Sequence, residues 1–390
     1  MPEEAGAQSI PAVAQEFALT REQLLHESGR VAEAIAGGLR GDASPFLLAP
    51  SFLGLPDGKE FGEFLALDFG GSNLRLARIR LERGDFWASA LKEWSLSELL
   101  SGRDGRAEDL FFRIAKEICV LAGSRGGCLG HTFSYPAVQT GVNTAILQSW
   151  TKEMALTGAE TIDVNGLLRR KLLELGRGDI IPSVVLNDTV AVLLAASYQS
   201  GCSGIIGSIC GTGHNSCYYE PQVKTIINLE SGNFSPACRN RFDRLLDKDS
   251  VQPGRQQLEK MSSGNYLAKL TVLAGRAAGI GDAGPVTAAE VAAVLDDTNN
   301  AWRPLARAVI SRAAQIVAAE YNGICAYLRE QGVQVEKIAI DGSIYNKVEL
   351  FKRELAGTLN SLAGRSIEIL PSSNSSLYGA AVACALLTKR

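Results

Sequence analysis

The stretch FLALDFGGSNLRLARIRL, residues 64–81, carries the strongest fold signal in this chain. It predicts an apolar strand, a glycine turn and a second strand, because glycine lets the backbone reverse direction without steric cost. The apolar positions of the second strand shift phase between Leu76 and Ile79. Either a β-bulge or a strand buried on both faces would explain that shift.

Two further glycine turns follow apolar strands. The segment GIIGSICGTGHNSCYYE, residues 204–220, repeats the strand–turn–strand pattern, and the strand of residues 335–341 runs into Asp341-Gly342-Ser343. Backbone N–H groups in such turns can approach a phosphate closely, although each turn by itself is more typical of an ordinary hairpin. The two similar hairpins predict a duplicated architecture with one glycine turn in each half.

Helical periodicity fills the remainder of the chain. We expect an amphipathic helix over residues 18–40, opened by Thr20 with Gln23 completing a capping box. Further predicted helices cover residues 108–123, 163–175, 253–275 and 286–296, a long stretch through 309–328 ended by Gly332, and the small-residue segment SSLYGAAVACALL at 375–387. Because strands alternate with helices, the predicted fold class is α/β with mixed sheets.

An Asn-Asp pair interrupts the apolar run VVLNDTVAVLL, residues 184–194. An ionised carboxylate in such surroundings needs compensation. Asp188 could supply it as the N-cap of a helix that begins at Thr189, or it could line a functional cavity that holds water and substrate. The local pattern leaves both alternatives open.

Composition excludes several classes of protein. The 390 residues leave room for two domains or lobes, and the formal net charge of −3 is spread along the chain. There is no run of Lys and Arg to indicate nucleic acid or a membrane surface, and no apolar segment approaches the roughly 18 residues of a membrane helix. The acidic N-terminus does not match a secretory signal. Neither a P-loop nor a dinucleotide-binding glycine pattern is present.

The cysteines indicate neither a zinc site nor a disulfide-bonded protein. All eight lack the spacing of a zinc site, and several lie in apolar segments. We therefore expect reduced core residues in a cytoplasmic protein.

Eight ordered segments resemble the hexokinase family, within the actin-like sugar kinases. They are LALDFGGSNLR (65–75), TFSYP (132–136), SWTKEM (149–154), LNDTV (186–190), CGTGHNSCY (210–218), INLESGNF (227–234), QPGRQQLEKMSSGNY (252–266) and AIDGSIY (339–345). The resemblance implies a two-lobed actin-like ATPase (ribonuclease H-like) fold, with mixed five-stranded sheets flanked by helices and a cleft between the lobes. It implies a small lobe of residues 63–186 plus about 376–390, a large lobe of about 18–62 plus 187–375, and a flexible segment at 1–17.

The resemblance also implies an ATP-dependent hexokinase or glucokinase that acts at the 6-hydroxyl of a hexose: glucose first, with mannose and fructose as further candidates. Asp188 would be the general base, and Lys152 would neutralise charge on the transferring phosphoryl group. The implied sugar contacts are Ser134, Thr151, Lys152, Asn187, Asp188, Asn215, Glu230, Gln256 and Glu259. Asp68 would hold Mg²⁺ through water. The implied nucleotide contacts are Gly70, Gly71, Ser72, Asn73, Arg75, Gly211, Thr212, Gly213, Asp341, Gly342 and Ser343. His131 and His214 are interpreted as neighbours of the site.

Two positions depart from the family. Ser231 stands where the family usually has Trp, and Ser375–Gly379 replaces a Gly-Ser-Gly-Lys-Gly run, so that Tyr378 occupies the Lys position. The second departure supports an alternative function, a catalytically weak sugar sensor of the same fold. An actin- or chaperone-like ATPase is a third hypothesis, against which the predicted sugar residues argue. The expected partners are a hexose and ATP, with no nucleic acid and no membrane; the sequence leaves the oligomeric state open.

Overall fold

The computed structural model describes residues 8–71, 73–100, 105–150, 156–158, 161–281 and 283–388. These residues pack into two compact units. The first takes in the chain up to Leu48, Ser208–Ser216 and Leu229–Pro371; the second takes in Ala49–Gly207, Cys217–Asn228 and the chain from Ser372. None of the described helices has the length and apolar character needed to span a membrane.

The second unit is built on a five-stranded sheet in the order β4-β3-β2-β5-β8. Strands β2, β3 and β4 are antiparallel neighbours, whereas β2, β5 and β8 run parallel, so the sheet is mixed as predicted. Their bounds are β2 Gly62–Phe69, β3 Asn73–Glu82, β4 Asp85–Ser95, β5 Gly127–Phe133 and β8 Ile180–Leu186. Both explanations of the phase shift in β3 hold: Leu76–Ile79 are buried at every position, and the register with β4 shifts between Arg78 and Ile79.

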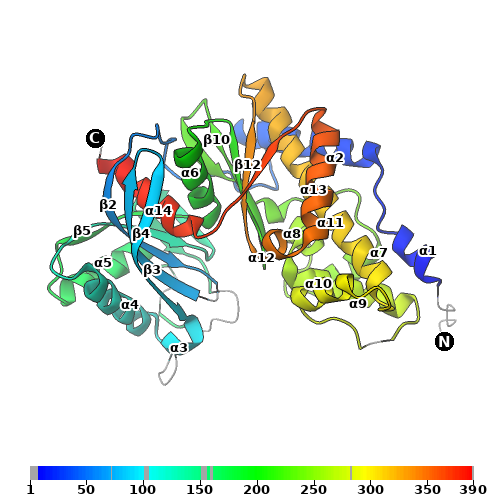
Figure 1. The fold of residues 1–390 in the computed structure, drawn as a ribbon, viewed down its shortest axis with the longest axis horizontal. Helices are drawn as coiled ribbons and strands as arrows, with labels where there is room; N and C mark the ends of the chain where they lie inside the picture. Colours follow the sequence, from blue (N-terminus) through cyan, green and yellow to red (C-terminus); the bar gives the residue numbers. More distant parts are fainter. Residues whose placement is uncertain are drawn as a thin grey trace. The chain divides into compact units, whose positions relative to one another are not determined.

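Helices α4 (Ala107–Ala122) and α5 (Val164–Glu174) pack against one face of this sheet (Figure 1). Leu65, Leu67 and Phe69 of β2 join Phe111 and Leu168 of these helices in one apolar cluster. Because side chains alternate along a strand, Ala66 and Asp68 must point to the opposite face.

Helix α14 (Ser375–Thr388) packs on that opposite face and on α6 (Asp188–Ser200). The approach is close because small residues meet there. A Cβ added at Gly130 of β5 would lie 2.2 Å from the carbonyl oxygen of Ala380, and one at Gly379 would lie 2.1 Å from that of Ala191. The Thr132 hydroxyl donates to the carbonyl of Ser376 at 2.8 Å. This contact explains why the predicted helix at 375–387 is rich in Gly, Ala and Ser.

The rest of the second unit consists of short elements that are not part of this sheet. Strands β6 and β7 form an antiparallel pair, and β1 pairs with β11. The bounds of these strands and of the remaining short helix are β1 Ala49–Pro50, α3 Leu96–Leu100, β6 Ala137–Gly141, β7 Thr144–Leu147 and β11 Thr225–Asn228.

The first unit is mostly helical, and α11 (Arg303–Glu330) is its central element. It packs against α2 (Arg21–Leu39), α13 (Glu349–Ala363), α8 (Gln257–Ser262) and α9 (Gly264–Ala277). The Thr20 capping box at the start of α2 is present as predicted. The remaining bounds are α1 Ile10–Gln15, the 3-10 turn η1 Ser231–Asn233, α7 Arg241–Lys248, α10 Ala288–Asp296, β12 Lys337–Asp341, α12 Ser343–Lys347 and β13 Glu368–Pro371.

A second sheet has the order β1-β11-β10-β9-β12-β13 among the described residues. The chain passes between the two units within β9 (Ile205–Cys210) and β10 (His214–Glu220). The sheet has six strands rather than the five predicted, because the two-residue strand β1 adds to its edge.

The N-terminal prediction was wrong for residues 8–17. Helix α1 begins behind the N-cap Ser9, and Val13 and Phe17 are fully buried. The Phe17 ring stacks on that of Phe242 with centroids 5.3 Å apart, and apolar packing of this kind holds the segment. Residues 1–7 lie outside the described residues. The predicted lobe boundaries at 62/63 and 186/187 stay predictions.

Candidate active site

The parallel strands of the second unit bring several predicted site residues to one edge. Phe69 lies opposite Phe133, and Thr132 lies opposite Leu186. Gly70, Ser134 and Asn187, which follow the three strands, therefore emerge at the same carboxyl edge, where open α/β sheets bind ligands. The backbone N–H of Ser134 donates to the carbonyl of Phe69 at 3.1 Å, which links the ends of β5 and β2.

Asp68 is the carboxylate of this edge and is only 3% exposed. It lies opposite Arg75 across the β2–β3 ladder. Nε and Nη2 of Arg75 both donate to Asp68 Oδ2, the former at 2.9 Å, and Nη1 donates to the side-chain oxygen of Asn374 at 2.9 Å. Arg75 therefore compensates the buried charge of Asp68 and joins the β-hairpin to the segment before α14.

The first glycine turn closes between β2 and β3. The N–H of Gly70 donates to the carbonyl of Asn73 at 3.0 Å, and a Cβ at Gly70 would come within 3.2 Å of that oxygen. The Asn73 carboxamide donates to Glu93 at 3.0 Å. Ser72, Thr151 and Lys152 lie outside the described residues, so their predicted roles stay predictions.

Asn187 and Asp188 stand where β8 passes into α6. The helix begins at Asp188, and its N-cap is Asn187, whose side-chain oxygen accepts from the backbone N–H of Thr189 at 2.9 Å. The interpretation of Asp188 as the N-cap was therefore wrong by one residue. Asp188 is half-buried in the first turn, where the helix dipole favours a negative charge.

In the first unit, the turn Gly211–Gly213 joins β9 to β10. The N–H of Gly211 donates to the carbonyl of Gly213 at 3.0 Å, and the N–H of Gly264, at the start of α9, donates to the carbonyl of Gly211 at 2.8 Å. Gly342, with φ +116°, packs against the same turn: a Cβ there would lie 2.5 Å from the carbonyl oxygen of Cys210. Two predicted glycine turns therefore meet, backbone to backbone.

The residues of the first unit that are predicted to contact the sugar lie beside that turn. The Glu259 carboxylate accepts from the backbone N–H of His214 at 3.2 Å, and the Asn215 oxygen accepts from the N–H of Ser231 at 3.1 Å. The Asn215 carboxamide also lies 3.5 Å from Glu230. A Cβ at Gly232 would lie 2.5 Å from Gln256 Oε1 and 3.1 Å from Glu259 Cβ. Gly232 therefore allows these side chains to pack closely.

Backbone strain occurs at two of the residues that are predicted to contact the sugar. Glu230 and Gln256 are not glycines, yet both have φ of +53°, in the left-handed region. Such conformations are held by the surrounding structure and concentrate at functional sites.

A buried ion pair that the sequence does not predict lies behind the second turn. The imidazole of His214 contacts Glu320 of α11, with Nε2 and Oε2 2.5 Å apart and both side chains 1% exposed. Burial by itself would lower the pKa of His214, but the carboxylate of Glu320 and the neighbouring Cys210 raise that pKa well above its usual value. No sequence pattern could have paired residues 106 positions apart.

Two family models, both described as hexokinase, match the chain: one over residues 9–198, the other over 205–275 and 286–386. The chain belongs to the hexokinase family. Human Hexokinase-3 is 30% identical over 95% of the chain, and the match covers 46% of that relative. The chain thus spans about half the length of Hexokinase-3 from human, rat and mouse. Hexokinase-1 of Schizosaccharomyces pombe is 28% identical, with 96% of the chain and 90% of the relative covered.

Solved hexokinases share the fold. One hexokinase crystal structure superimposes with a TM-score of 0.85 at 27% identity, covering 97% of this chain and 98% of the other. The hexokinase from Schistosoma mansoni, solved in complex with glucose, has a TM-score of 0.79 at 23% identity, with 96% and 98% covered. The predicted actin-like sugar kinase fold of the hexokinase family is therefore confirmed.

Both departures from the hexokinase family have a structural counterpart. Ser231 is fully buried beside Asn215. Tyr378 stacks on Phe86, with ring centroids 3.9 Å apart and planes 18° from parallel. Its ring therefore packs against β4.

Proposed function

We propose that the protein transfers the terminal phosphoryl group of ATP to the 6-hydroxyl of a hexose, with glucose first and mannose and fructose next. Membership of the hexokinase family supports the reaction class. The observation that carries the proposal is the grouping of Asp68, Ser134, Asn187 and Asp188 at one sheet edge, where the ends of three parallel strands meet.

Asp188 is proposed as the general base. Phosphoryl transfer needs an oriented nucleophile and charge neutralisation, with little other chemistry from the protein. The helix dipole favours a negative charge in the first turn of α6, and a carboxylate there can accept the hydroxyl proton as the oxygen attacks. Its neighbour Asn187 fixes the start of that helix, so the carboxylate is presented from a rigid element.

The polar side chains proposed for sugar contact suit a hexose. A hexose hydroxyl both donates and accepts hydrogen bonds, so carboxylates and carboxamides recognise it well. The proposed contacts are Ser134, Thr151, Lys152, Asn187, Asp188, Asn215, Glu230, Gln256 and Glu259. Lys152 is further proposed to neutralise the negative charge on the phosphoryl group during its transfer.

Asp68 is proposed to hold Mg²⁺ through water. Mg²⁺ prefers oxygen ligands and retains several waters, so a single carboxylate together with phosphate oxygens suffices. Asp68 supplies such a carboxylate at the sheet edge from which Gly70, Ser134 and Asn187 emerge. Bound Mg²⁺ would neutralise phosphate charge. The phosphates themselves are assigned to the glycine turns with Ser72, Asn73 and Arg75, and the adenosine to Asp341–Ser343.

The test is an assay of sugar phosphate formation with Mg-ATP and glucose, mannose or fructose, comparing wild type with Asp188→Ala. We expect sugar-dependent turnover that the substitution lowers by about 10²–10⁴-fold, the usual contribution of a general base. No sugar phosphate from the wild type, with glucose still binding by calorimetry, would favour the sugar-sensor function instead. Full-rate ATP hydrolysis without sugar would favour an ATPase.

A further inference from the structure

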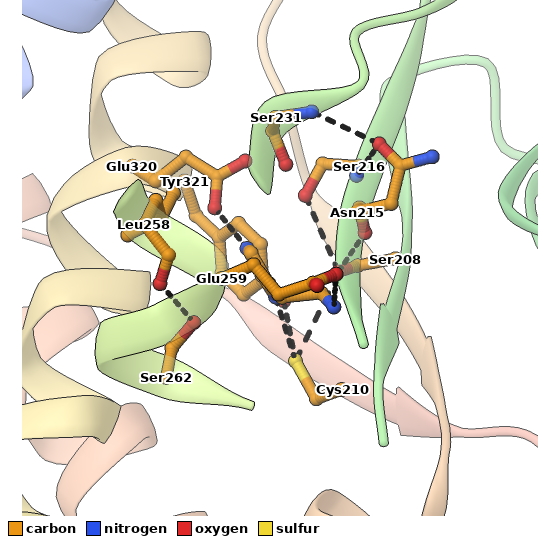
Figure 2. Close-up of polar contacts among 11 residues, drawn as sticks. Ser208, Cys210, Asn215, Ser216, Ser231, Leu258, Glu259, Ser262, Glu320 and Tyr321 are labelled. Atoms are coloured by element: carbon orange, nitrogen blue, oxygen red, sulfur yellow. Dashed lines mark hydrogen bonds and ion pairs between the residues drawn. The ribbon is translucent and has the colours of Figure 1, made fainter. Parts of the chain in front are cut away.

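A buried polar cluster lies directly behind the Gly211–Gly213 turn, and the proposed chemistry does not use it. It consists of Ser208 and Cys210 on β9, His214 on β10, and Glu320 and Tyr321 on α11. Figure 2 shows the side chains of α11 directed toward the strands, with Glu259 of α8 beside them. Every member of the cluster is at most 4% exposed.

The ion pair between His214 and Glu320 dominates the cluster. A buried pair of charges is retained only where its members compensate each other, since removing one leaves an uncompensated charge. Oε1 of Glu320 is buried and has no hydrogen-bond partner among the described residues, so the carboxylate depends on its contact with His214. This dependence ties β10 to α11 at one point, at the first residue after the turn.

Tyr321 ties the other strand to the same helix. Its hydroxyl donates to the Ser208 hydroxyl at 2.7 Å and lies 3.3 Å from the sulfur of Cys210. The Ser208 hydroxyl in turn donates to the carbonyl of Asn215 at 2.8 Å. Helix α11 therefore holds both strands that flank the glycine turn.

The backbone of His214 connects the turn to Glu259, which is proposed to contact the sugar. Its N–H donates to Glu259 Oε2 at 3.2 Å. There is no spare room around that contact: a Cβ at Gly213 would lie 2.8 Å from the same oxygen, and one at Gly232 would lie 3.1 Å from the carbonyl oxygen of His214. A small displacement of the turn would therefore move the Glu259 carboxylate.

We propose that the His214–Glu320 pair is a positioning device that holds the second glycine turn and, through it, the Glu259 carboxylate for hexose binding. The inference rests on the proposed function, in which Glu259 contacts the sugar. His214 and Glu320 act through Glu259 and are positioning residues, with no role in the chemical step.

The test replaces the whole pair, because a single substitution would leave a buried charge. His214→Leu/Glu320→Leu removes both charges and keeps apolar volume, so the variant should fold. The matched control is Asp243→Asn/Arg312→Met. Arg312 also lies on α11, its pair with Asp243 is equally buried, at 1% and 2% exposure, and Asn keeps an acceptor for the cap of α7. Arg312 is eight residues from Glu320, about 12 Å along the helix.

We expect His214→Leu/Glu320→Leu to raise the KM for hexose about tenfold, with kcat within about threefold, because uniform binding is lost. Deuterium exchange of residues 211–216 should also become faster. The control variant should change neither the KM for hexose nor the deuterium exchange of residues 211–216. An unchanged KM and unchanged exchange in the His214/Glu320 variant, or an equal rise in both variants, would overturn the proposal. If the wild type forms no sugar phosphate, the proposed function fails, and the exchange comparison still decides whether the pair holds the turn.

Discussion

The carboxamide oxygen of Asn187 lies 2.9 Å from the backbone nitrogen of Thr189 and 2.7 Å from its hydroxyl oxygen, so Asn187 caps α6. The cap leaves Asp188 as the first helical residue. Asp188 Oδ1 also accepts from the Thr189 N–H at 2.9 Å, so the two adjacent residues share this bond at the helix start. Asp188 in addition offers a carboxylate at the edge of the sheet.

Substitution of Asn187 should affect stability more than substitution of Asp188. Loss of a side-chain cap costs about 1 kcal/mol, so Asn187→Ala should lower the free energy of unfolding by about that amount. Asp188→Ala removes a second acceptor for the Thr189 N–H and a negative charge in the first turn, so it should lower the free energy of unfolding by about 0.5 kcal/mol. Urea unfolding of both variants measures this difference. A larger loss in Asp188→Ala would mean that its carboxylate, and not Asn187, holds the helix start.

Asp68→Asn should raise the Mg²⁺ concentration needed for half-maximal sugar phosphorylation by about tenfold, as for other groups that bind a metal through an intervening ligand. The measurement is a Mg²⁺ titration at fixed ATP. Glu93→Gln serves as the control, because Glu93 pairs with Asn73 on the same hairpin but is exposed and not assigned to the metal. Equal Mg²⁺ dependence in wild type and Asp68→Asn would remove Asp68 from the metal site.

His131 should make the fold sensitive to acid. The residue is fully buried, its Nδ1 lies 3.1 Å from the side-chain oxygen of Asn165, and its Nε2 has no partner among the described residues. Burial lowers the pKa of His131 from 6.5 to about 4, against the opposing effect of Asn165. Because the unfolded chain binds this proton and the folded chain does not, the stabilisation is complete above pH 6.5 and is lost as the pH falls toward 4.

The expected loss is about 2 kcal/mol of unfolding free energy between pH 7.5 and pH 5. Denaturant unfolding at both pH values measures it, with His131→Gln beside the wild type. The variant lacks the titrating group and should lose about 2 kcal/mol less than the wild type does. An identical pH dependence in the two proteins would show that His131 does not remain neutral in the fold.

Two glycines in helices should respond oppositely to alanine. Gly379→Ala places a methyl group 2.1 Å from the backbone oxygen of Ala191, which cannot yield without moving α6, so we expect a loss of about 1–3 kcal/mol together with reduced turnover. Gly357 lies within α13 and has no atom within 4 Å of a Cβ. Gly357→Ala should therefore gain about 0.5–1 kcal/mol. Thermal unfolding of both variants tests the pair, and a tolerated Gly379→Ala would mean that α14 packs less closely on α6.

Local signals in the chain were sufficient for most elements. The capping box at Thr20, the phase shift between Leu76 and Ile79 and the apolar strands before each glycine turn depend on residues within a few positions of one another, and all are found in the structure. The start of α6 was misassigned by one residue because Asn and Asp are almost equally good N-caps. Which of the two binds the helix start depends on backbone angles that the sequence does not contain.

The sequence by itself predicted the family, the α/β class with its main helices and the strands beside the glycine turns, and the residue types proposed for catalysis, because periodicity, turn chemistry and motif spacing are properties of neighbouring residues. It did not predict β4 or α13. Tertiary structure decided the rest. Phe17 is ordered by Phe242, Arg75 is held by both Asp68 and Asn374, and His214 is buried against Glu320. In each case the stabilising partner lies far away along the chain or on another element, and burial raises the energetic value of the contact only after the chain has folded.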